Sequence, residues 1–143
     1  MKFVIDSNIL FAALMKDSTT KELIILLDVE LYFPDSLMKE IFKYKDLIKK
    51  KAGFSEQEFH ENLKTLLEYI ILVPEEELKK FLNQALEEMK FIDPKDSPVL
   101  ACALAHEGSV IWAQDEHLHK QKLVQAVRTK EVIDIYLKGK IQF

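Results

Sequence analysis

The sequence is poor in cysteine, glycine and proline, and these shortages exclude several classes of protein. A single cysteine, Cys102, leaves no partner for a disulfide within the chain, which excludes a disulfide-stapled scaffold and favours a reducing compartment. Only 3 glycines and 4 prolines occur among 143 residues, which argues against long irregular or low-complexity segments. The composition therefore predicts one compact domain spanning residues 1–143.

Long hydrophobic runs are also absent. The run LIILL at 23–27 is far too short to cross a bilayer. The apolar run FVI at 3–5 ends at Asp6, well short of a signal peptide's apolar region. We therefore expect a soluble, cytoplasmic protein with no membrane partner.

Arginine is nearly missing, since 19 of the 20 basic residues are lysines and only Arg128 is an arginine. Bidentate recognition of bases by arginine is therefore almost unavailable. The net charge of −4 also argues against binding nucleic acid through the overall field of the protein. Any affinity for nucleic acid must come from a local basic patch or from bound cations.

Apolar runs and helical patterns alternate along the chain. Helices are expected at 7–15, capped by Ser7 or Asn8, and at 97–107, with Ser97 as N-cap before Pro98; another runs from Asp35 or Ser36 to about residue 51 and stops before Gly53. This alternation predicts an α/β fold, a three-layer sandwich around a twisted, mostly parallel, Rossmann-like sheet. The expected strands lie at 2–5, 31–33, 69–73, 109–113 and 125–127, and further helices at 19–28, 58–69, 75–90, after Asp115 and at 130–137.

Three aspartates stand where an open parallel sheet places its sites, beyond the carboxyl ends of strands at a point where strand order reverses. Asp6 follows the first strand directly, and Asp115 comes two residues after the strand at 109–113. Asp96 precedes the buried helix that feeds that strand. We expect the three carboxylates to converge at one edge of the sheet.

Glu40 joins them through a helical-wheel argument. At about 100° per residue, Glu40 lies about 20° from Leu47 and about 40° from Tyr44, so it projects beside the apolar face of its helix. A carboxylate on the core side of a helix is costly unless it is paired or binds a cation. Several carboxylates without a cysteine set or histidines at zinc spacing favour Mg²⁺ or Mn²⁺, ions that activate water and neutralise a phosphate.

Each acid also has a simpler interpretation. Asp6, Asp96 and Asp115 all stand where helix N-caps are wanted, and Glu40 could pair with a lysine of a neighbouring helix. Asp93, beside Pro94, suits a turn or a supporting role at the site. Asn8 either caps a helix or orients Asp6.

Lysines crowd the helix that carries Glu40. Lys43, Lys49, Lys50 and Lys51 form either a solvated face or a rim that guides phosphates toward the acids.

His117 and His119 are two positions apart on an expected helix, so their side chains point in different directions and make a poor chelate. We interpret them as solvated; the alternative is that one of them approaches the substrate.

Taken in order, four segments resemble the motifs of PIN domains. VIDSNIL at 4–10 resembles their opening strand, SLMKEIFKY their second acidic position at Glu40, IDPKDSPVLACALAH their third motif at Asp96, and IWAQDEHL their fourth at Asp115. The resemblance implies a PIN-like parallel-sheet sandwich, Mg²⁺- or Mn²⁺-dependent endonuclease activity on RNA, and metal ligation by these acids. Many relatives are toxins of toxin–antitoxin pairs, which implies a homodimer and an inhibitory antitoxin protein.

One position departs from the family pattern. Many relatives carry Ser or Thr where this chain has Ala113, and Gln114 is the candidate substitute for the missing hydroxyl.

Two other functions are weighed against this resemblance. An Asp-nucleophile phosphatase would need a second Asp at the position of Asn8. A non-catalytic PIN-like module that binds RNA or a protein remains the alternative, favoured mildly by Ala113 and the negative charge.

Overall fold

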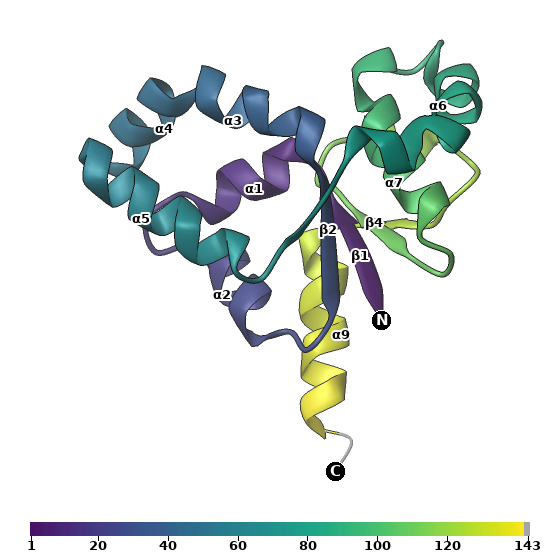
Figure 1. The fold of residues 1–143 in the computed structure, drawn as a ribbon. Helices are drawn as coiled ribbons and strands as arrows, with labels where there is room; N and C mark the ends of the chain where they lie inside the picture. Colours follow the sequence, from purple (N-terminus) through teal and green to yellow (C-terminus); the bar gives the residue numbers. More distant parts are fainter. Residues whose placement is uncertain (142–143) are drawn as a thin grey trace.

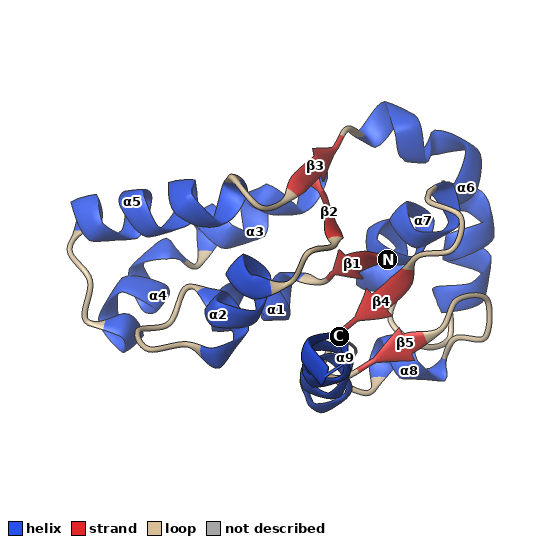
Figure 2. Ribbon diagram, turned by 90° about the horizontal axis from the view of Figure 1, so that it is seen from below, coloured by secondary structure: helices blue, strands red, loops and turns tan. Residues whose placement is uncertain are grey.

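A sheet of five parallel strands forms the centre of the molecule (Figures 1 and 2). The computed structural model describes the backbone of residues 1–141 and the side chains of residues 1–139, so the last two residues of the expected domain lie outside it. The strand order β3-β2-β1-β4-β5 confirms the predicted parallel α/β architecture. The strands are β1 (Lys2–Ile5), β2 (Glu30–Pro34), β3 (Ile71–Val73), β4 (Val110–Trp112) and β5 (Ala126–Val127).

Helices cover both faces of this sheet and complete the predicted three layers. Helices α6 and α7 lie on one face, and α1, α2 and α9 lie on the other, with α3, α4 and α5 beyond α1 and α2 (Figure 2). None of the helices in the described part of the chain is long and apolar enough to cross a membrane. The helices are α1 (Ser7–Ala13), α2 (Thr19–Leu26), α3 (Met38–Lys43), α4 (Lys45–Ala52), α5 (Glu56–Leu67), α6 (Glu75–Met89), α7 (Ser97–Ala105), α8 (His117–Lys120) and α9 (Thr129–Ile141), with 3-10 turns η1 (Asp35–Leu37) and η2 (Pro94–Asp96).

Helix α7 anchors one face of the sheet. Its segment from Val99 to Ala103 is buried on every side, between β1, β2 and β4 beneath it and α6 above it. Small side chains such as Ala101 and Ala103 let the helix approach the sheet closely, which explains a helix that is apolar nearly all round. This packing fixes the start of α7, and with it Asp96, relative to β1 and β4.

The expected long helix from about 35 to 51 is wrong in its continuity. The chain makes the turn η1, then α3, and bends at Tyr44 (φ −100°, ψ 14°) before α4. Backbone hydrogen bonds nevertheless continue across the bend, from Tyr44 N to Glu40 O and from Ile48 N to Tyr44 O. The bend therefore leaves little trace in the helical pattern, and it brings the Tyr44 ring edge-to-face against Phe11 of α1.

Several local signals for helix ends are confirmed, and two are corrected. Gly53 ends α4 in the left-handed conformation, and the Ser55–Glu58 capping box opens α5. Neither Ser7 nor Asn8 caps α1, because Asp6 does so, and Ser97 is the first residue of α7 while Asp96 stands at its N-cap position. Both corrections have the same cause. In each helix the acid directly before the first helical residue already occupies the N-cap position, so the residue after it is part of the helix.

Candidate active site

The predicted acids lie where the strand order of the sheet reverses. From β1 the chain builds outward to β2 and β3 on one side, and later returns to place β4 and β5 on the other side. Strands β1 and β4 are direct neighbours, with Ile5 opposite Trp112, so their carboxyl ends meet. Asp6 follows β1 and Asp115 follows β4, and both emerge at this reversal point, where open α/β sheets form their sites.

Asp6 is almost completely buried at this edge, with 4% of its surface exposed. Its Oδ1 accepts a hydrogen bond from the backbone N of Ile9 at 3.0 Å, which fixes the carboxylate at the N-terminus of α1. Burial raises the pKa of Asp6 to about 7; the hydrogen bond from Ile9 opposes this rise, and the charges of Asp115 and Asp96 add to it. Asp6 therefore does cap α1. Capping alone does not explain its position, because burying a carboxylate near two others costs more free energy than a helix cap contributes.

Asp115 is held by one oxygen and left unsatisfied at the other. Its Oδ2 accepts a hydrogen bond from Nδ2 of Asn8 at 3.0 Å, while its Oδ1 is buried and has no hydrogen-bond partner among the described residues. Glu116, not Asp115, stands at the N-cap position of α8, so capping does not explain Asp115. Asn8, the second residue of α1, therefore holds Asp115 with its side chain, and its expected capping role is not seen. Its backbone also hydrogen-bonds the Asp6 carboxylate, so Asn8 contacts both acids.

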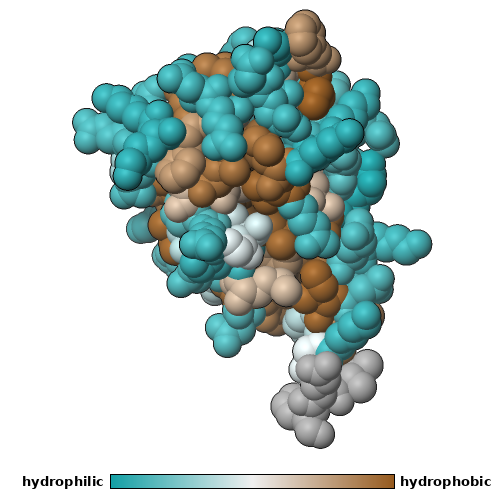
Figure 3. Space-filling model, turned by 90° about the vertical axis from the view of Figure 1, so that its right-hand side faces the viewer, coloured by the Kyte–Doolittle hydropathy of each residue, from teal (hydrophilic) through white to brown (hydrophobic). Residues whose placement is uncertain are grey.

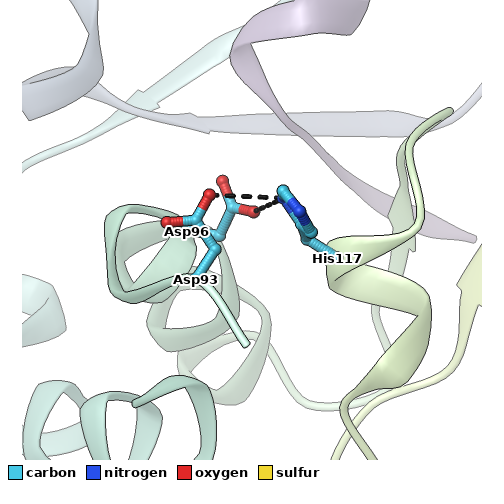
Figure 4. A group of neighbouring side chains, drawn as sticks. All are labelled: Asp93, Asp96 and His117. Carbon is cyan, nitrogen blue, oxygen red and sulfur yellow. Dashed lines mark ion pairs between the residues drawn. The ribbon is translucent and has the colours of Figure 1, made fainter. Parts of the chain in front are cut away.

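Asp96 lies beside Asp93 and His117 (Figure 4). Nδ1 of His117 is 3.3 Å from an oxygen of Asp93 and 3.8 Å from an oxygen of Asp96. Burial raises the pKa of Asp96 to about 6, with the charges of Asp93, Asp115 and Glu40 adding to the shift and His117 opposing it. Asp96 makes no side-chain hydrogen bond at the N-terminus of α7, so the capping interpretation does not account for it.

Within the part of the chain that has described side chains, this trio is the one group of three acids or histidines close enough to share a metal ion. One potential ligand atom from each of Asp93, Asp96 and His117 lies within 4.8 Å of the other two. Asp93 also accepts a hydrogen bond from the backbone N of Lys95 at 3.1 Å, so its expected turn role is present as well. The sequence predicted a solvated His117. Its position beside Asp93 was missed because tertiary packing brings these two segments together.

Glu40 approaches the same acids from α3. It lines a small cavity of about 70 Å³ together with Asp6, Asn8, Lys95 and Asp96. Glu40 takes part in no ion pair among the described side chains, so the alternative of a lysine partner is not seen. The apolar helix face predicted beside Glu40 is not buried, because Tyr44 and Leu47, which follow the bend, are 42% and 48% exposed.

The expected supporting and guiding residues separate into two groups. Lys43 and Lys51 line a groove that adjoins the small cavity. Lys49 is instead paired with Glu56 at 2.8 Å, and Lys50 is exposed outside the groove. The side-chain oxygen of Gln114 accepts a hydrogen bond from the backbone N of Thr129 at 2.6 Å, which commits it to the start of α9.

Comparison with protein families shows which family the chain belongs to. A family model described as "PIN domain" matches residues 4–138. The chain belongs to the PIN-domain family. Members of the family are generally nucleases that act on RNA and typically bind divalent metals. A search of curated proteins and a search of solved structures found no significant match.

The residues of this PIN site fit a divalent cation. Carboxylate oxygens dominate the donor set, which suits hard cations such as Mg²⁺ and Mn²⁺. The buried, unpartnered Oδ1 of Asp115 would otherwise be a costly unsatisfied acceptor. Burial raises the pKa values of Asp6 and Asp96, and the charges of the neighbouring acids add to the rise, so both carboxyl groups resist ionisation without a positive charge nearby.

Proposed function

We propose that this PIN-domain chain is an endoribonuclease that hydrolyses RNA phosphodiester bonds and depends on Mg²⁺ or Mn²⁺. The observation that carries the proposal is that Asp6 and Asp115 follow neighbouring strands at the reversal point of the sheet, while Glu40 and Asp96 line the same small cavity as Asp6. A buried carboxylate oxygen of Asp115 without a hydrogen-bond partner supports it.

The chain's own residues hold the reacting groups in place. The proposed ligands are Asp6, Asp96 and Asp115, and Glu40 lines the small cavity with Asp6 and Asp96. In the structure, the ligand atoms within 4.8 Å of one another are those of Asp93, Asp96 and His117, so the proposed set extends from this trio toward Asp6 and Asp115. When bound, the cation supplies positive charge that neutralises a phosphate and lowers the pKa of an attacking water. The Asn8 hydrogen bond fixes the orientation of Asp115, and Ile9 fixes that of Asp6.

Incubating the pure protein with an unstructured RNA tests the activity. We expect cleavage with Mn²⁺ or Mg²⁺ and none with EDTA, and we expect Asp96→Asn to abolish cleavage while Asp134→Asn, an exposed change on α9, leaves it unchanged. Cleavage that persists in EDTA would overturn the metal mechanism. RNA binding without any turnover by the wild type would instead favour a non-catalytic PIN module.

The same proposal extends to the toxin branch of the family and to a cytoplasmic place of action. We expect a homodimer that a small antitoxin protein inhibits, since a basic side chain placed among these acids would satisfy the charges otherwise balanced by the cation. A small neighbouring reading frame whose product binds this chain and stops RNA cleavage would support it. Full activity in the presence of that product would exclude the antitoxin role.

A further inference from the structure

A groove larger than the acidic cavity runs beside it, between α1 and the bent pair α3 and α4. Its volume is about 510 Å³, within the range of roughly 300–1,000 Å³ that is usual for sites of small organic groups. Asn8, Glu40 and Lys95 line both the groove and the small cavity that holds Asp6 and Asp96. A chain lying in the groove would therefore enter the candidate active site at one end.

The basic residues of the groove are left unneutralised. No ion pair joins Lys43, Lys51 or Lys95 to an acid within residues 1–139. The contrast on α4 is clear, because Lys45 and Lys49 of the same helix both pair with Glu56, at 2.6 Å and 2.8 Å. In a chain with a net charge of −4, three ammonium groups without an acid partner around one groove form a local surface that complements a polyanion.

The wall between these lysines is apolar and aromatic. Tyr44 and Leu47 line the groove although they are 42% and 48% exposed, so the groove presents unsatisfied apolar surface to solvent. The Tyr44 ring is held edge-to-face by Phe11, with ring centroids 5.8 Å apart, and the Lys43 ammonium lies 5.4 Å from its centroid. A positioned aromatic ring with cations around it is the surface on which single-stranded nucleic acids stack their bases.

We propose that this groove binds the unpaired nucleotides of a single-stranded RNA next to the scissile phosphate. A base packs against Tyr44 and Leu47, the flanking phosphates lie against Lys43 and Lys51, and Lys95 contacts the phosphate nearest the acids. The inference rests on the proposed nuclease function and assigns the groove residues of this chain that contact the base and the phosphates. Base-paired RNA keeps its bases stacked inside the duplex, so it cannot offer one to the Tyr44 ring.

Two matched pairs of variants test the groove. Tyr44→Ala is compared with Phe42→Ala, which removes a 49% exposed aromatic ring that does not line the groove. Lys51→Glu is compared with Lys50→Glu, the same charge reversal one position away on α4, outside the groove. For cleavage, each variant is made in the wild-type chain. For binding, each is combined with Asp96→Asn. Binding is measured to a fluorescent unstructured RNA, to the same RNA as a duplex, and to DNA of the same sequence.

We expect Tyr44→Ala to weaken binding of the single strand by about fivefold or more, and Phe42→Ala to change it by less than about twofold. Lys51→Glu should weaken binding and lower the slope of log Kd against log salt by about 0.7 for each phosphate that the side chain no longer neutralises, while Lys50→Glu should not. The wild type should bind the single strand more tightly than the duplex. Melting curves of all four variants check that the fold is kept.

The proposal fails if the groove variants bind and cleave RNA as their controls do, even when the wild type cleaves RNA normally. It also fails if Tyr44→Ala changes the oligomeric state in sedimentation but leaves RNA affinity unchanged, because the groove would then be a protein interface. If the wild type never cleaves RNA but binds it through the groove, the proposed nuclease function is wrong and the proposed RNA-binding groove is supported.

Discussion

Asn8 and Asp115 are joined by a hydrogen bond of 3.0 Å, from Nδ2 to Oδ2, although 107 positions separate them in the chain. Asn8 lies at the start of α1 after β1, and Asp115 follows the neighbouring strand β4. The bond occupies one oxygen of Asp115 and leaves the buried Oδ1 without a partner. A side chain held in this way presents its free oxygen in one direction, which is what a metal ligand requires.

The first prediction is that Asn8→Ala lowers RNA cleavage about tenfold to a hundredfold, the usual cost of losing a group that orients a metal ligand. Asn8 is exposed, so the free energy of unfolding should change by less than about 0.5 kcal/mol. The measurement is kcat with saturating Mn²⁺, beside Asn83→Ala, the same change at an exposed position of α6. Equal activity of the two variants would show that Asp115 needs no such support.

The second prediction is that Asp96→Asn abolishes cleavage without weakening the metal-free fold. Removing one of several repelling carboxylates should hold or raise the melting temperature in EDTA, whereas a lost helix cap typically costs about 1 kcal/mol. Wild type should gain about 2.7 kcal/mol at a hundredfold excess of Mn²⁺ over its dissociation constant, and the variant less. Asp134→Asn is the control; a variant that melts much lower yet cleaves normally would make Asp96 a structural residue.

The third prediction concerns pH in the absence of metal. The folded-state pKa values of Asp6 and Asp96, about 7 and about 6, lie above the ordinary 3.8, so the folded state holds its protons more tightly than the unfolded state. Stability from these groups is therefore full below about pH 4 and is lost as the pH rises to about 7. At about 1.4 kcal/mol per pKa unit, the two groups together lose at most about 7 kcal/mol.

Urea unfolding in EDTA at pH values from 4 to 8 measures this loss. The double variant Asp6→Asn with Asp96→Asn should show a flatter profile, because neither amide titrates and Asn at position 6 can still cap α1. Profiles that fall equally in wild type and double variant would show that other groups govern the pH dependence.

The fourth prediction is that the protein sediments as a dimer through the exposed part of α2. Leu26 is 57% exposed on this helix, whereas Leu23 is buried and Leu27 half-buried, so the exposed apolar surface of α2 is confined to Leu26 and its neighbour Ile25. Leu26→Lys should therefore shift the sedimentation coefficient toward the monomer. A wild type that is monomeric at every concentration would remove the dimer.

A second face competes with α2. The side of the molecule that carries α6 shows hydrophobic residues gathered at the centre of the view among hydrophilic ones (Figure 3). On α6, Leu86 is 40% exposed. Leu86→Lys should leave the dimer intact; dissociation by this change in place of Leu26→Lys would assign the interface to the α6 face.

The sequence alone was sufficient for the fold class and the family. Strands alternating with helices predict a parallel sheet because each crossover needs a helix, and acids placed directly after strands predict a shared edge because parallel strands end together. Asp6 and Asp115 followed from this local rule and lie at neighbouring strand ends in the structure. These features depend on periodicity and position, which one chain displays without its neighbours.

Only the tertiary structure decided how the side chains around these acids are used. The bend at Tyr44 keeps its backbone hydrogen bonds, so the sequence pattern reads as one helix, yet the bend opens the groove beside Glu40. Asn8 reaches Asp115, His117 reaches Asp93, and Lys49 pairs with Glu56 while Lys51 stays free. Some of these contacts join segments that are far apart in the chain. Others depend on the direction in which neighbouring side chains point. Tertiary packing determines both.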